Sequence, residues 1–171
     1  DRPPRPSPTK RKYAMLNELE HGDKGFEFRP SAVVECCVLR AGGLKDADSG
    51  VFAGGSDPYA TVRYGPFHSL KTVGRTKVIN NANDPVWGEG RFRFPMRVDA
   101  DCADHQIVVE VWDSDAGSIG DADDALGQAV FAVEDYVNAT GPIRAVLRPQ
   151  PGEDTVTGWV EVRTQLLGTA R

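Results

Sequence analysis

The sequence has no long apolar run and little cysteine. No stretch approaches the roughly 20 apolar residues with which a helix spans a bilayer, so a membrane-spanning chain is not expected. The three cysteines are an odd number, and Cys36 and Cys37 are adjacent on an expected strand, where neighbouring side chains point to opposite faces. We therefore expect free thiols in the cytosol rather than a disulfide framework. There is no signal-peptide pattern, and the chain begins at Asp1 rather than Met, so we expect a piece of a longer protein.

The motifs of common enzyme classes are missing as well. The sequence has no Gly-x-Ser-x-Gly elbow, no phosphate-binding loop and no dinucleotide-binding fingerprint. Its histidines, His21, His68 and His105, fall in separate segments without an obvious nucleophile beside them. We therefore expect neither catalysis nor a small-molecule substrate.

Charge is unevenly spread along the chain. Residues 1–12 carry five basic residues against Asp1, a net charge of +4, which leaves −9 for the remainder of a chain of net charge −5. An acidic body argues against nucleic acid as a partner, because nucleic-acid binders present a basic face. The basic, proline-rich residues 1–12 predict a disordered linker, which serves either as a solvated tether or as an arm attracted to anionic lipid.

The remaining residues predict an all-β domain. Residues 13–30 hold apolar side chains without a clear period and predict an extension that packs on the domain, a short helix followed by an extended segment. From residue 31 onward, short alternating runs are separated by Gly, Pro, Asp and Asn, as in β-sandwiches. We expect an eight-stranded antiparallel sandwich over residues 31–167, with no helix and with a tail at 168–171. The expected strands are 33–39, 59–64, 71–79, 90–94, 106–112, 126–133, 143–147 and 159–166.

Aspartates recur where expected strands begin or end. They are Asp46 and Asp48 after the first strand, Asp57 before the second, Asp113 and Asp115 after the fifth, and Asp121, Asp123 and Asp124 before the sixth. Aspartate is common in turns for conformational reasons alone, but two loops with this pattern indicate a cation held between repelling carboxylates. Oxygen ligands from flexible loops suit Ca²⁺, whereas transition metals favour the His or Cys that these loops lack.

Five short motifs follow one another along the chain. They are Leu44 with Asp48, Ser56-Asp57-Pro58-Tyr59, Asp84-Pro85-Val86-Trp87-Gly88-Glu89, Val111-Trp112-Asp113-Ser114-Asp115 and Asp124-Ala125-Leu126-Gly127. In this order they resemble the C2 domain family over about residues 31–167. The resemblance implies a Ca²⁺-binding end built from three loops, with Asp48, Asp57, Asp113, Asp115 and Asp124 as ligands. The first and third loops are longer than usual for the family, so Asp46, Asp121 and Asp123 remain rival ligands.

The resemblance also implies a topology, since the family has two circularly permuted forms. The last expected strand, which opens at Trp159, has no obvious counterpart before residue 31. We therefore expect the permuted, type II form, whose first strand is Val33–Leu39. Trp159 itself, like Trp87 and Trp112, is expected to pack in the core or at its rim.

Two further features favour docking on a membrane. Val51, Phe52 and Ile119 are apolar residues in hydrophilic loops, so they are either stray exposed side chains or membrane wedges. Lys71, Arg75 and Lys77 are four and two residues apart, an even spacing that places them on one face of a strand. In the family this strand can bind phosphoinositide head groups, although a solvated strand face is the alternative.

The sequence thus predicts a Ca²⁺-dependent docking module for anionic phospholipid, either phosphatidylserine or a phosphoinositide. The resemblance implies a cytoplasmic peripheral membrane protein, part of a larger protein of membrane trafficking or lipid signalling. The alternatives are a Ca²⁺-independent module that binds a protein partner, and the regulatory C2 domain of a kinase or lipase.

Overall fold

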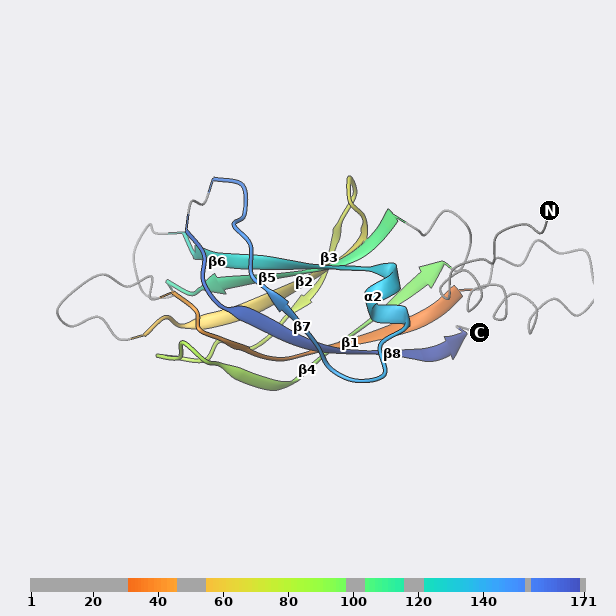
Figure 1. Cartoon of the computed structure of the whole chain (residues 1–171), viewed down its shortest axis with the longest axis horizontal. Coiled ribbons are helices and arrows are strands. Elements are labelled where there is room, and N and C mark those ends of the chain that lie inside the picture. The colour runs from red at the N-terminus through yellow and green to blue at the C-terminus, as the bar shows by residue number, and fades with distance from the viewer. Residues whose placement is uncertain (1–30, 46–54, 98–103, 116–121, 153–154, 170–171) are drawn as a thin grey trace, which may run out of the picture.

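A computed structural model describes residues 31–45, 55–97, 104–115, 122–152 and 155–169 of the 171-residue chain. The described chain folds into two four-stranded antiparallel sheets that pack face to face (Figure 1). Sheet A has the order β4-β1-β8-β7, and sheet B has the order β3-β2-β5-β6. The strands of sheet A are β1 (Ser31–Gly42), β4 (Val86–Arg97), β7 (Ile143–Val146) and β8 (Trp159–Thr169). Those of sheet B are β2 (Pro58–Pro66), β3 (Lys71–Arg75), β5 (His105–Asp113) and β6 (Asp124–Ala132).

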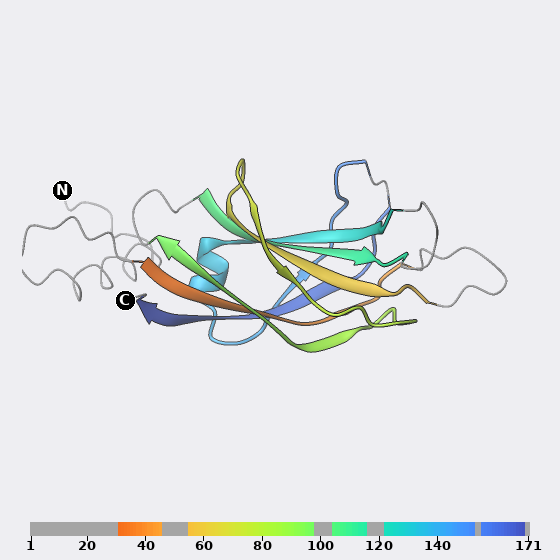
Figure 2. The same cartoon turned by 180° about the vertical axis from the view of Figure 1, so that it is seen from behind.

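Alternate side chains of the strands build the core between the sheets. On β1 the side chains of Val34, Cys36 and Val38 face inward and are fully buried, as are those of Val109 and Val111 on β5. Period-two alternation with one face apolar is the pattern that a half-buried strand requires. Sheet B lies above sheet A in Figure 1, and Figure 2 gives the same two layers from behind.

The predicted all-β sandwich and all eight predicted strands are confirmed among the described residues. The predicted absence of a helix is wrong, because α2 (Val133–Val137) follows β6 directly. The Asp135 carboxylate accepts a hydrogen bond from the Ala132 N–H at 2.9 Å. This bond satisfies an amide that the first helical turn leaves free, and an acidic first turn also suits the helix dipole.

Strand lengths differ at several ends from those predicted. The ladder of β3 stops at Arg75, although the N–H of Thr76 and that of Ile79 still donate to Ala60 and Pro58 on β2. At the other end of the domain, β8 continues to Thr169, beyond the predicted boundary at residue 167. The extension predicted over 13–30 and the linker over 1–12 lie outside the described residues.

The last strand occupies a central place in sheet A, since β8 pairs with β1 on one side and with β7 on the other. This order is the one that the permuted topology predicts, and the permuted topology itself stays a prediction, because residues 1–30 are outside the described part. No helix in the described part combines the length and the apolar character needed to cross a bilayer.

Candidate metal centre

The start of β2, the end of β5 and the start of β6 lie at one end of the sandwich, on the left in Figure 1 and on the right in Figure 2, and five described aspartates lie on or next to these strand ends. We call this end the acidic pole, and its members are Asp57, Asp113, Asp115, Asp123 and Asp124. Asp57 directly precedes β2, Asp113 ends β5, and Asp124 begins β6. Because these three strands are antiparallel neighbours in sheet B, the start of β2 and that of β6 meet the end of β5.

Asp113 is the most enclosed member of the pole, with 3% of its surface exposed. Its Oδ1 accepts a hydrogen bond from the Asp57 N–H at 2.6 Å, and the Ser114 N–H donates to the Asp57 carbonyl oxygen at 3.1 Å. Asp57 in turn accepts through Oδ1 from the Asn81 N–H at 2.7 Å. Backbone donors thus fix both carboxylates, which a buried or half-buried charge requires.

Asp123 is held through both of its oxygens. Its Oδ2 accepts from the Tyr59 hydroxyl at 2.6 Å, and its Oδ1 accepts from the Asp115 N–H at 3.2 Å. Burial and the hydrogen bond to this carboxylate raise the pKa of Tyr59 to about 12. The Arg75 guanidinium lies 5.4 Å from the centroid of the Tyr59 ring and partly offsets that rise. Asp123 therefore ties the loop that follows β5 to β2.

A β-bulge sets the position of Asp124. On β5, Val111 lies opposite Gly127, but its neighbour Trp112 lies opposite Ala125, so one residue of β6 has no partner. Gly127 takes φ +131°, and a Cβ there would stand 2.6 Å from the Val156 side chain. β-Bulges change the direction of the side chains that follow them, and they often contain a glycine because its backbone can adopt a positive φ. After the bulge, Asp124 lies directly opposite Asp113.

The described part of the pole supplies an incomplete ligand set. No three carboxylate, histidine or cysteine side chains among the described residues lie close enough together to hold a metal ion. Of the predicted ligands, Asp57, Asp113, Asp115 and Asp124 are brought to the pole, together with the rival Asp123. Asp46, Asp48 and Asp121 lie outside the described residues. The donors that are present are oxygens only, which fits Ca²⁺ by chemistry and disfavours a softer metal.

The predicted membrane wedges also lie outside the described residues. They are Val51, Phe52 and Ile119, in the segments 46–54 and 116–121. Both segments adjoin described residues of the pole, Lys45 and Gly55 for the first and Asp115 and Ala122 for the second.

The prediction that Lys71, Arg75 and Lys77 share one strand face is wrong for Lys71, and their role as a basic patch for lipid stays a prediction. A register shift between Val62 and Arg63 places Lys71 opposite Tyr64, whose ring stacks on Phe94 inside the sandwich, whereas Arg75 lies opposite Thr61. Because directly opposed residues share a face and alternate residues of β2 share a face, the shift breaks the alternation that put Lys71 with Arg75. All three basic side chains, Lys77 included, are exposed.

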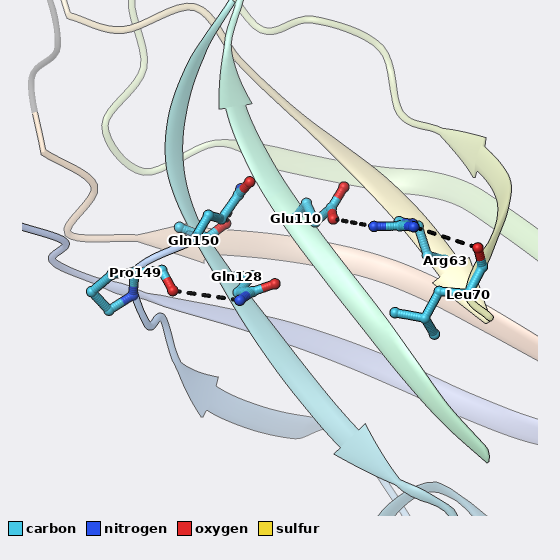
Figure 3. A network of polar contacts seen from close by, with 7 residues as sticks. Arg63, Leu70, Glu110, Gln128, Pro149 and Gln150 are labelled. Carbon is cyan, nitrogen blue, oxygen red and sulfur yellow. Dashed lines mark hydrogen bonds and ion pairs between the residues drawn. The ribbon is translucent and has the colours of Figure 1, made fainter. Parts of the chain in front are cut away.

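Arg63 stabilises the turn beside this basic strand. Figure 3 shows its guanidinium between β5 and the β2–β3 turn: Nη1 pairs with Glu110 Oε1 at 2.9 Å, and Nη2 donates to the Leu70 carbonyl oxygen at 3.4 Å. On the same side of sheet B, Gln128 donates to the Pro149 carbonyl oxygen at 3.4 Å. These contacts, with the backbone bonds between Gln128 and Arg148, cover part of the edge strand β6.

Sequence reasoning missed the hydrogen bonds made by Tyr59. The residue was visible in the Ser-Asp-Pro-Tyr motif, but nothing in that motif tells which carboxylate its hydroxyl meets. The partner, Asp123, is more than sixty residues later in the chain and reaches Tyr59 only when β2, β5 and β6 pair.

Comparison with known proteins identifies the family. The model of the family described as C2 domain matches residues 32–147, more than half of the chain, so the chain belongs to the C2 domain family. It is 33% identical over 101 residues to the Arabidopsis thaliana Protein C2-DOMAIN ABA-RELATED 11, covering 59% of this chain and 52% of that protein. It is also 33% identical over 102 residues to an Arabidopsis thaliana protein named Calcium-dependent lipid-binding protein, covering 60% of this chain and 17% of that protein.

Solved structures support the same fold. A C2 domain of plant Extended Synaptotagmin 1 superposes with a TM-score of 0.64 at 24% identity, covering 84% of this chain and 99% of that one. The chain spans about half the length of the first curated relative and less than a fifth of the other.

Proposed function

We propose that this chain is a Ca²⁺-dependent module that docks on anionic phospholipid membranes. The observation that carries the proposal is the acidic pole, where Asp124 lies opposite Asp113 and the Asp57 N–H donates to the Asp113 carboxylate. Membership of the C2 family supports it, as does the similarity to a relative whose name describes calcium-dependent lipid binding.

In this proposal the calcium ligands are Asp48, Asp57, Asp113, Asp115 and Asp124. We assign Asp123 to positioning the pole instead, because both of its oxygens accept hydrogen bonds, from the Tyr59 hydroxyl and the Asp115 N–H. Bound Ca²⁺ supplies positive charge at the pole and open coordination positions for lipid phosphate oxygens. The aspartates hold that charge at the end of the sandwich, while backbone donors keep Asp57 and Asp113 fixed.

The neighbouring residues define how the module meets lipid. Val51, Phe52 and Ile119 enter the membrane interface beside the pole, where apolar side chains gain free energy from burial. Arg75 and Lys77, with Lys71 on a different face, offer cations to phosphatidylserine or to a phosphoinositide. The sites on this chain are binding sites, and we propose that any catalysis belongs to another part of a larger protein of membrane trafficking or lipid signalling.

Sedimentation with phosphatidylserine liposomes during a calcium titration tests the proposal. The 171-residue chain should sediment with the liposomes only when calcium is present. Asp113→Asn combined with Asp115→Asn should abolish this response, since asparagine keeps an acceptor oxygen but removes the charge.

The matched control is Asp104→Asn, which makes the same change at an exposed residue just before β5, at the opposite end of that strand from the pole. It should leave the calcium response intact. Calcium-dependent binding that survives the double substitution, with the circular dichroism spectrum unchanged, contradicts the assignment of the pole. A complete lack of response to calcium supports the protein-binding alternative instead.

A further inference from the structure

The outer face of sheet A carries a cluster of arginines on an otherwise acidic chain. We call it the arginine face, and its arginines are Arg40, Arg91, Arg93, Arg144 and Arg163, all exposed. The described carboxylates on this face are those of Glu35 and Glu161, with Asp84 at its end beside Gly42. Five cations against three carboxylates leave a surplus of two positive charges, whereas the whole chain has a net charge of −5.

Two glutamates each fix a pair of arginines. Glu35, which is buried, lies 2.8 Å from Arg93 Nε and 3.6 Å from Arg91 Nη1. Glu161 lies 2.9 Å from Arg40 Nε and 3.1 Å from Arg144 Nη2. Each carboxylate compensates one of its two partners, so the guanidinium groups are held in place while positive charge remains.

One row across the sheet has no carboxylate at all. The register places Arg91 of β4 and Arg163 of β8 on either side of Cys37 of β1. Neighbouring strands are about 4.8 Å apart, so the backbones that carry the two arginines are about 10 Å apart. Arg163 has no ion-pair partner among the described residues, and burial raises the pKa of the Cys37 thiol, which therefore stays neutral between them.

The row of Arg40, Glu161 and Arg144 separates this row from an aromatic and apolar area of the same face. The Arg144 guanidinium lies 3.6 Å from the centroid of the Trp159 ring, and that of Arg40 lies 5.6 Å from it. Val146 lies opposite Trp159 and is 73% exposed, and Val86 lies opposite Arg40 and is 67% exposed. Tryptophan and arginine surrounded by exposed apolar residues are the composition that protein-binding hot spots favour.

We propose that the arginine face binds an acidic segment of a partner protein. Carboxylates of that segment pair with Arg91 and Arg163, and an apolar side chain of the segment contacts Trp159 between Val86 and Val146. The carboxylates of Glu35 and Glu161 already pair with arginines of this face. A planar guanidinium can donate two parallel hydrogen bonds to a carboxylate, so arginine binds a carboxylate better than a lysine ammonium does. Residues 1–12 of this chain are not the acidic segment, because they carry a net charge of +4.

Binding of this partner is separate from the proposed membrane docking, because the partner uses the arginine face and the membrane uses the acidic pole. The acidic pole is made by strand ends, whereas the arginine face runs along the strands of sheet A (Figure 1). A chain docked by its pole therefore leaves the arginine face accessible. Failure of calcium-dependent docking and failure of acidic-segment binding are separate outcomes.

Nuclear magnetic resonance titration of the isotope-labelled 171-residue chain tests the proposal. The probe is a synthetic peptide of alternating glutamate and leucine, added to about 1 mM, a concentration that detects even weak complexes. We expect resonance shifts at the side chains of Arg91, Arg163 and Trp159. A peptide in which glutamine replaces every glutamate should produce none of these shifts.

Arg163→Gln is the decisive variant, because this arginine holds no described ion pair and its loss should not disturb the fold. It should weaken peptide binding about tenfold, as loss of a hot-spot arginine does. The matched control, Arg148→Gln, removes one charge from an exposed position beside sheet B and should leave binding unchanged.

Several outcomes overturn the proposal. These are no shift with the glutamate peptide, shifts confined to sheet B, and equal weakening by both variants, which indicates attraction by net charge alone. Calcium-free binding to phosphatidylserine liposomes that Arg163→Gln abolishes assigns the face to lipid. Self-association in analytical ultracentrifugation that Arg163→Gln abolishes assigns it to a second copy of the chain.

Discussion

At the scale of single residues, the hydrogen bond from Tyr59 to Asp123 links a strand to the acidic pole. The hydroxyl is 2.6 Å from Asp123 Oδ2, and the tyrosine is 8% exposed. A hydrogen bond to a charged acceptor in such a place contributes about 1.5–3 kcal/mol. Burial of the hydroxyl, and then the bond to Asp123, favour the neutral phenol, so the Tyr59 pKa rises to about 12 from an ordinary 10.0.

This shift predicts a loss of stability in alkali. A folded-state pKa above the unfolded value gives stability that is complete below pH 10 and is lost as pH rises toward 12. The chain should therefore lose on the order of 2 kcal/mol of unfolding free energy across this range, and Tyr59→Phe should lose less. Urea denaturation at a series of pH values measures the difference.

The comparison between the two proteins isolates Tyr59. Burial also raises the pKa of Cys36 to about 12, but this thiol titrates in both proteins and cancels in the difference. Asp123→Asn should reduce the alkaline loss only in part, because it removes the charge that favours the neutral phenol but leaves burial, the larger cause of the raised pKa. Identical pH profiles for the wild type and Tyr59→Phe would contradict the role assigned to the hydrogen bond.

The individual pole residues were predicted from the sequence to different degrees. Asp57 and Asp113 stand in fixed motifs at strand ends, so their meeting follows from antiparallel pairing. The sequence left Asp123 and Asp124 as rivals, because their roles depend on where β6 starts and on which donor each carboxylate meets. The donor that a carboxylate meets is set by tertiary contacts, which the neighbouring sequence does not reveal, as the Tyr59–Asp123 bond illustrates.

At the scale of elements, the bulge in β6 affects both the stability of sheet B and the positions of the aspartates at the pole. Gly127 has a backbone conformation that other residues rarely adopt, and Val156 and Leu147 occupy the space where a side chain would lie. The bulge also sets which residue of β6 faces Asp113.

Gly127→Ala should therefore affect both stability and calcium binding. Strain at positive φ and overpacking together should cost about 1–3 kcal/mol of unfolding free energy. The displaced start of β6 should also weaken the response to calcium in the liposome assay. Chemical denaturation provides the first measurement.

Gly141→Ala is the control for this substitution, because a Cβ at Gly141 has no heavy atom within 4 Å. Its effect should stay within about 0.5 kcal/mol. Equal effects of the two substitutions would show that the bulge has no special role.

The elements themselves were largely predictable, since alternation marks strands wherever one face is buried. The helix α2 was not, because Val133 still continues the alternation of β6, and Tyr136 and Val137 follow it at helical spacing for a single turn only, too short a run to mark a helix. The Asp135 side chain, which accepts from the Ala132 N–H, then helps to start the helix. The shift in β3 was likewise hidden, because a bulge changes the face of Lys71 without changing the spacing of the basic residues.

At the scale of the whole molecule, opposite charges are placed on different surfaces. The acidic pole lies at one end, and the arginine face runs along the side of sheet A. Neutralising the pole should therefore stabilise the whole fold, since cation binding to the native state shifts the folding equilibrium.

Calcium should raise the melting temperature of the chain. At a concentration about 100 times its dissociation constant, a ligand adds about 2.7 kcal/mol to the unfolding free energy, which for a domain of this size is several degrees. Differential scanning calorimetry with calcium, and with magnesium as the comparison, measures the shift. Asp124→Asn should remove most of it.

Asp123→Asn is the matched comparison, because it changes the adjacent aspartate in the same way. This variant should keep most of the calcium-induced shift while its metal-free melting temperature falls. An equal response to magnesium, or a shift that Asp124→Asn leaves intact, would contradict the proposed ligand set.

The position of β8 between β1 and β7 has a consequence for synthesis of the chain. β1 is the first described strand, yet its partner β8 follows more than a hundred residues later, so sheet A stays open until the ribosome has released Trp159–Thr169. Pairing between such distant segments slows folding, and until then the unpaired edge of β1 is exposed to other chains. The arginine face lies on both sides of the pairing between β1 and β8, so it is complete only after β8 has joined the sheet.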